Sequence, residues 1–112
     1  MAVATNLAAC AVSDQADVPP RTTPIAYTLD ASGVQLVGRS HRIDFGRTDH
    51  SAERAMTKLV GQAAISRSIC ADGRPYVDWA DGTRLYFNNG AFRGWSKIGA
   101  DGVVQRAGAT CS

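Results

Sequence analysis

The first regular pattern along the chain lies in residues 25–45, where apolar and polar residues alternate in short runs. Residues 25–29 and 34–37 are rich in β-forming side chains, and the segment Asp30-Ala31-Ser32-Gly33 between them has turn chemistry. These two runs predict a β-hairpin. Residues 41–45 alternate polar and apolar positions and end at Gly46, which predicts a third strand with Ile43 and Phe45 facing the core.

A helical period follows. Apolar residues recur at intervals of three and four and form one stripe, which consists of Ala52, Ala55, Met56, Leu59 and Val60. Thr48 or Asp49 is suited to cap the helix N-terminus, and Gly61 stands where a left-handed C-cap belongs. The pattern therefore predicts one short helix with an apolar face turned to the core.

After Gly61 the period returns to two, and the turn signals Asp72-Gly73, Asp81-Gly82, Asn89-Gly90 and Asp101-Gly102 punctuate it. Such spacing is typical of an antiparallel meander, with strands expected at 64–70, 75–80, 83–88, 91–98 and 103–107. The predicted fold class is α+β: an antiparallel β-meander with one short helix and an N-terminal β-hairpin.

The turns also predict register. A two-residue Asn89-Gly90 turn sets Phe87 opposite Phe92 and Leu85 opposite Gly94 on one face. The other face then pairs Tyr86 with Arg93 and Arg84 with Trp95 as a cation–π surface. At Asp81-Gly82 a three-residue loop with a glycine bulge is preferred, because it keeps Val77, Trp79, Leu85 and Phe87 on one face.

The length of 112 residues allows one core. We expect residues 1–24 to be a signal remnant with a flexible linker, and residues 25–112 to be a single α+β domain. The formal net charge of +2 is too small to indicate a partner, and no apolar run is long enough for a membrane-spanning helix. A domain of this size is marginally stable unless something staples it.

The three cysteines suggest one disulfide bond and one lipid attachment site. Leu7-Ala8-Ala9-Cys10 has the form of a lipobox, the site at which bacterial lipoproteins are cleaved and lipidated, and a polar, proline-containing tether follows it. Met1 to Asn6 supplies neither the basic region nor the apolar stretch of a signal peptide, so either a true start lies upstream or the match is accidental.

Cys70 precedes a turn and Cys111 is the penultimate residue, where a disulfide would tie down the C-terminus. The bridge would close a loop of about 42 residues, worth roughly 4 kcal/mol in the chain-entropy model. With Cys70 and Cys111 bridged, the thiol of Cys10 remains available for lipidation. The alternative is a cytoplasmic protein with three reduced thiols.

The elements Ile43-Asp44-Phe45-Gly46, a helix ending at Gly61, Cys70, Trp79, Gly82 to Phe87, and Gly90-Ala91-Phe92-Arg93-Gly94-Trp95 follow one another over a little more than half of the chain. In this order the chain resembles small bacterial cell-envelope lipoproteins of unassigned role. More loosely, a short helix before an antiparallel meander resembles outer-membrane-assembly lipoproteins and β-lactamase-inhibitor proteins. The looser resemblance implies binding of other proteins through an exposed sheet face.

Catalytic chemistry has little support in the sequence. His41 and Asp44 point to opposite faces of their strand, which argues against a hydrogen-bonded dyad, and we expect His50 to be exposed in the first turn of the helix. Three aspartates stand directly before glycine, where turn formation explains them. No catalytic residue, metal site or cofactor is predicted.

The candidate binding face consists of Arg84, Tyr86, Arg93, Trp95 and Lys97, because Arg and aromatic residues are enriched at the energetic centres of protein interfaces. The prediction is a non-catalytic, envelope-tethered protein-binding or assembly module in the periplasm or at the outer membrane. Its partner is an unknown envelope protein, and it meets the membrane only through a lipid anchor. The alternatives are a small hydrolase-type enzyme and an Arg-rich nucleic-acid-binding domain, which an envelope location disfavours.

Overall fold

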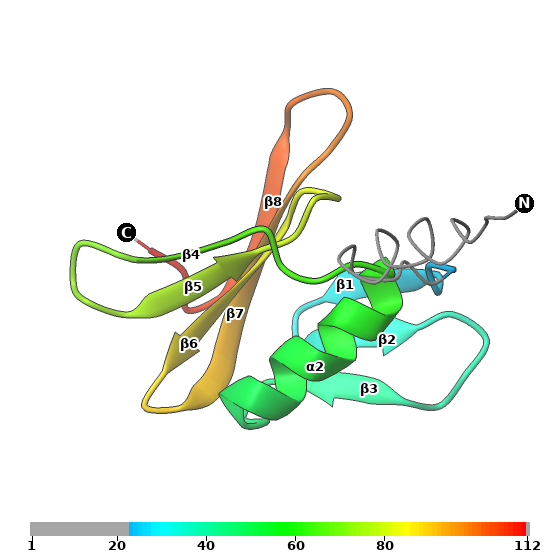
Figure 1. Cartoon of the computed structure of the whole chain (residues 1–112), viewed down its shortest axis with the longest axis horizontal. Coiled ribbons are helices and arrows are strands. Elements are labelled where there is room, and N and C mark those ends of the chain that lie inside the picture. Colours follow the sequence, from blue (N-terminus) through cyan, green and yellow to red (C-terminus); the bar gives the residue numbers. More distant parts are fainter. Residues whose placement is uncertain (1–22, 112) are drawn as a thin grey trace, which may run out of the picture.

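The computed structural model describes residues 23–111, which form one α-helix and eight strands in two antiparallel sheets (Figure 1). The first sheet has the order β1-β2-β3 and the second the order β4-β5-β6-β7-β8. The elements are β1 (Tyr27–Asp30), β2 (Gly33–Leu36), β3 (Arg42–Asp44), α2 (Asp49–Val60), β4 (Ser66–Ile69), β5 (Pro75–Asp78), β6 (Thr83–Asn88), β7 (Ala91–Ile98) and β8 (Val104–Gly108). This arrangement confirms the predicted α+β class.

The first sheet is the expected hairpin with a third strand. β1 and β2 pair from Tyr27 with Leu36 to Asp30 with Gly33, and Val34 of β2 pairs with Ile43 of β3. The Asp30 carboxylate accepts a hydrogen bond from the Ser32 amide at 2.9 Å, which closes the turn.

Helix α2 begins and ends at the predicted caps. The Thr48 hydroxyl accepts a hydrogen bond from the Ser51 amide, so Thr48 is the N-cap. Gly61 adopts the left-handed conformation with φ of 84°, and its amide donates to the Thr57 carbonyl. The buried side chains are those of the predicted stripe, with Ala55 partly buried beside them.

The turns of the second sheet agree with their sequence signals. Asn89 and Gly90 both have positive φ, as a two-residue hairpin turn requires. The Trp79 amide donates to the Thr83 carbonyl across a three-residue loop whose last residue, Gly82, has φ of 90°. The preferred glycine loop is therefore confirmed, and Val77, Trp79, Leu85 and Phe87 are all buried.

One part of the predicted register is wrong. Phe87 pairs with Phe92 as expected, but a bulge then shifts the ladder, so that Tyr86 pairs with Gly94 and Leu85 with Trp95. Arg84 consequently lies opposite Ser96, and the predicted pairs Leu85–Gly94, Tyr86–Arg93 and Arg84–Trp95 do not form. Arg93 is the extra residue of the bulge. A one-residue offset moves every later side chain of β7 to the other face.

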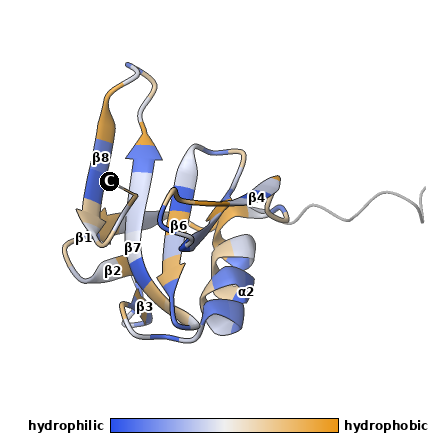
Figure 2. Cartoon of the chain, turned by 90° about the vertical axis from the view of Figure 1, so that its left-hand side faces the viewer, coloured by the Kyte–Doolittle hydropathy of each residue, from blue (hydrophilic) through white to orange (hydrophobic). Residues whose placement is uncertain are grey.

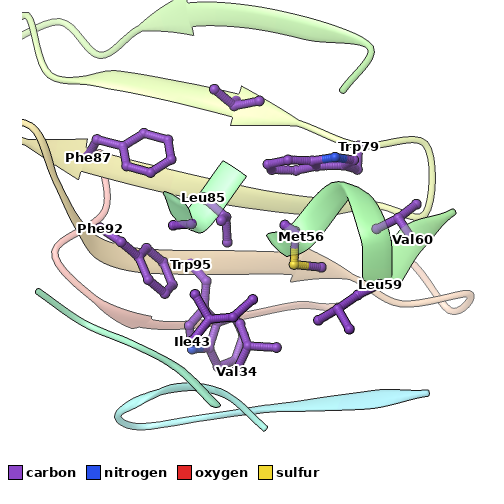
Figure 3. Close-up of a cluster of buried hydrophobic side chains, with 12 residues drawn as sticks. Val34, Ile43, Met56, Leu59, Val60, Trp79, Leu85, Phe87, Phe92 and Trp95 are labelled. Carbon is purple, nitrogen blue, oxygen red and sulfur yellow. The ribbon is translucent and has the colours of Figure 1, made fainter. Parts of the chain in front are cut away.

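The core lies between α2 and the two sheets. Figure 3 shows Val34 and Ile43 of the first sheet on one side of the cluster. Phe87 of the second sheet and Trp79, which directly follows β5, lie on the other. The segment after β3 joins the sheets, because the Gly46 amide donates to the Phe92 carbonyl. The Trp95 indole donates to the Asp30 carbonyl at 2.7 Å and makes a second link.

The chain beyond β8 is held across the second sheet. Cys70 and Cys111 form the predicted disulfide, with their Cα atoms 5.4 Å apart. β8 is one edge of the sheet and Cys70 directly follows the opposite edge strand β4, so residues 109–111, here called the C-terminal strap, connect the two edges (Figure 1). A Cβ atom on Gly94 would lie 2.4 Å from the Ala109 carbonyl oxygen, so this position has room only for glycine beneath the strap.

Candidate protein-binding face

The face of the second sheet that points away from α2, here called the outer face, carries a groove of about 490 Å³. Alternation along β5, β6 and β7 places Asp78, Arg84 and Ser96 on this face, opposite to the core residues Val77, Leu85 and Trp95. The strap lies over Gly94, beside the ladder partner Tyr86. The groove therefore occupies the part of the outer face between the strap and the β7–β8 turn.

Arg84 organises the floor of the groove. Its guanidinium donates two hydrogen bonds to the Asp78 carboxylate, at 2.6 and 3.2 Å, and stacks over the Tyr76 ring at 3.9 Å. The hydrogen bonds to Asp78 are the main cause that raises the pKa of Arg84 above its ordinary value. The Tyr86 and Ser96 hydroxyls share a hydrogen bond of 3.0 Å on the same floor. These contacts hold the floor in one geometry before anything binds.

The rim of the groove is apolar and exposed. Ile65 is 65% exposed, Ile98 56% and Val104 41%. Figure 2 shows hydrophobic colour where β7 and β8 approach their turn. Arg106 also lines the groove and forms no ion pair with any residue between 23 and 111. An apolar rim around a rigid Arg and Tyr floor is suited to contact with another protein.

The five predicted binding residues do not lie together on one exposed face. Arg84 lies partly exposed on the outer face. Tyr86 lies on the same face but is only 6% exposed, and Trp95 is 4% exposed and belongs to the core. The prediction for Trp95 is wrong because the bulge at Arg93 reverses the alternation of β7. Arg93 itself is exposed at the bulge.

Lys97 also lies on the α2-facing side, where it pairs with Thr83 in the ladder. Its amine contacts the Tyr27 hydroxyl at 3.2 Å and the Asp81 carboxylate at 3.3 Å. Burial, together with Asp81, raises the pKa of the Tyr27 hydroxyl. Burial would raise the pKa of Asp81 as well, but hydrogen bonds from Tyr27 and Thr83 outweigh it and lower that pKa. This cluster ties β1 to the second sheet.

The remaining predicted sites are located as follows. Cys10 and the linker up to residue 22 lie outside the described residues. His41 and His50 are exposed, and the carboxylate of Asp44 accepts from Arg42 at 2.7 Å. Within residues 23–111, no group of three or more His, Cys, Asp and Glu side chains is placed to hold a metal, and no helix is long and apolar enough to cross a membrane.

Sequence reasoning missed the groove residues that come from other strands. Asp78 and Arg106 join Arg84 in the groove only through the pairing of β5 with β6 and of β7 with β8. The signal available for the apolar rim was the position of Ile98 and Val104 on either side of the Asp101-Gly102 turn, whereas Ile65 had no such signal. Comparison with family models, curated proteins and solved structures finds no match for the chain.

Proposed function

We propose that this protein is a non-catalytic, envelope-tethered module that binds another envelope protein in the outer-face groove. The observation that carries the proposal is the exposed apolar rim around the Arg84 floor. The partner would place an apolar side chain against the cross-strand pair Ile98 and Val104, with a carboxylate beside it.

The chemistry of the groove supports a protein partner. Exposed branched side chains lose little conformational entropy when they are covered, and aromatic and Arg residues concentrate the binding energy of interfaces. Arg84 is already neutralised by Asp78, so it offers little to a phosphate backbone. Arg106 is the groove cation that forms no ion pair within residues 23–111, and it selects a partner with a nearby acidic residue.

The compartment is proposed on the cysteines. A disulfide between Cys70 and Cys111 is typical of proteins that reside in an oxidising compartment. Lipidation of Cys10 would then place the domain at the periplasmic or outer-membrane surface, on the linker that follows it. Such a tether raises the local concentration of the domain near membrane-bound partners.

The experiment is site-specific photocrosslinking in the bacterial host. A photoreactive phenylalanine is placed at Ile98 or Val104, and at the exposed His50 of α2 as the control position. The proposal predicts one adduct of the same mass from Ile98 and Val104 and none from His50. Arg106→Glu should abolish that adduct, whereas Arg54→Glu, an equal charge change on α2, should leave it.

The opposite pattern would contradict the proposal. Adducts that form equally from His50, or that persist in Arg106→Glu, would show that the outer-face groove does not select the partner. A circular dichroism melt of each variant separates loss of binding from loss of folding.

A further inference from the structure

A second hollow, with a volume of about 320 Å³, is lined mainly by residues of α2 and of the β2–β3 hairpin. Its floor is apolar and consists of Ile25, Leu36, Ile43, Ala55 and Leu59. Its polar lining is entirely basic and consists of Arg39, His41, Arg42, Arg47 and Lys58. No Asp or Glu lines it. The hollow is thus an apolar depression ringed by positive charge.

Three of the four Lys and Arg residues of this ring form no ion pair within residues 23–111. Of the twelve Lys and Arg residues of the chain, Arg21 precedes the described residues, which leaves eleven. Five of these eleven form ion pairs within residues 23–111: Arg42, Arg67, Arg74, Arg84 and Lys97. Of the six others, Arg39, Arg47 and Lys58 all line this one hollow.

Neutral partners hold Arg47 in place. Its Nε donates to the Ser51 hydroxyl at 2.7 Å and its Nη1 donates to the Arg42 carbonyl at 3.2 Å. Neither contact neutralises the guanidinium. Arg42 differs, because the Asp30 and Asp44 carboxylates pair with it. The uncompensated cations of the hollow are therefore Arg39, Arg47 and Lys58.

We propose that this hollow binds a fatty carboxylate, with the alkyl chain on the apolar floor and the carboxylate among Arg39, Arg47 and Lys58. The volume falls at the lower end of the range for small-ligand pockets, and a few polar groups around an apolar floor are the usual lining of such sites. The opposite charges of ligand and rim fix the orientation of the ligand. The concave floor favours one inserted chain over a flat membrane surface. This site is separate from the proposed protein-binding groove.

The test is a titration of the ¹⁵N-labelled full chain with hexanoate, octanoate and decanoate below their micelle concentrations, followed by amide NMR shifts. Each buried methylene stabilises binding by about 0.8 kcal/mol, a factor of about four in Kd. The Kd should therefore fall by up to about fourfold per methylene, with shifts confined to the lining residues. Decylammonium, which has the same chain and the opposite charge, should not bind there.

Variants make the test specific. Lys58→Gln should weaken decanoate binding by about two- to fivefold, the effect of one partly solvated ion pair, while Arg54→Gln on the same helix should not change it. Ala55→Glu places a carboxylate in the hollow and should abolish binding, and the shifts of the unbound spectrum report whether the variant folds.

Three results would overturn the proposal. One is equal binding of decanoate and decylammonium, which removes the role of charge. Another is a set of shifts that centres on the outer face of the second sheet. The third is binding to anionic lipid vesicles with no response to monomeric decanoate, which would make this side a membrane-contacting surface instead.

Discussion

The disulfide between Cys70 and Cys111 gives a stability prediction whose magnitude follows from the length of the loop that it closes. Cys70 and Cys111 are separated by 41 positions, so the bridge closes a loop of about 42 residues that includes β5 to β8. The chain-entropy relation gives a stabilisation of about 4 kcal/mol for a loop of this length. Because small domains are stable by only about 5–15 kcal/mol in total, the loss would be a large fraction of the whole.

The perturbation is Cys70→Ala with Cys111→Ala in a Cys10→Ala background. Alanine avoids placing a hydroxyl at position 70, where the side chain is buried. The comparison protein carries Cys10→Ala alone, so that no free thiol can exchange with the bridge.

The expected result is a loss of about 4 kcal/mol in urea unfolding. At about 4–8 °C per kcal/mol for a domain of this size, the melting temperature should fall by about 16–32 °C. The comparison protein should lose the same amount when a reductant is added. A loss below about 1 kcal/mol in both cases would refute the reasoning, since the C-terminal strap would then not be held by the bridge.

Three further predictions concern the core and its pH dependence. Phe87→Ala, at a side chain 3% exposed and packed on Phe92, should cost about 3–5 kcal/mol in thermal unfolding; a loss under 1 kcal/mol would contradict the Phe87–Phe92 pairing. Trp95→Phe removes the donor to the Asp30 carbonyl and should cost about 1 kcal/mol while leaving outer-face crosslinking unchanged, whereas lost crosslinking would mean that Trp95 contacts the partner. The hydrogen bonds from Arg42 lower the pKa of Asp30 from 3.8 to about 2. The stability that the ionised Asp30 carboxylate contributes is therefore present above pH 3.8 and is lost as the pH falls toward 2. The urea midpoint of Asp30→Asn should consequently fall less over that interval than that of the native chain, and parallel curves would refute the assignment.

Local chemistry determined much of the fold, and for this reason it could be predicted. Thr48 and Gly61 satisfy the helix ends through their own side chain or backbone freedom, independently of the rest of the chain. Asn89-Gly90 and Asp81-Gly82 impose their turns in the same local way. Such signals need no knowledge of what packs against them.

The predicted register of β7 was wrong because the true register depends on a contact between residues that are distant in sequence. Gly94 lies under Ala109 of the C-terminal strap, and the bulge at Arg93 brings the two backbones together. A glycine inside a strand is a recognised sign of a bulge or of close backbone approach. That sign was available at Gly94, and it would have placed Trp95 in the core.

The candidate sites were only partly accessible from sequence. The alternation of one strand places Arg84 and Tyr86 on the same face, but Tyr86 is buried there and not exposed. The basic hollow combines Arg39 and Arg47 with Lys58 from the last turn of α2, so it exists only after the helix packs on the first sheet. No spacing along the chain indicates such a site.

The envelope location is central to the proposed function, and an intact mass measurement tests it most directly. The protein is expressed from its native locus, including whatever precedes Met1, and is isolated without reductant. The account predicts a chain that begins at a lipidated Cys10, with Cys70 joined to Cys111. An unmodified chain that retains Met1 and three free thiols would contradict the envelope location and the tether together.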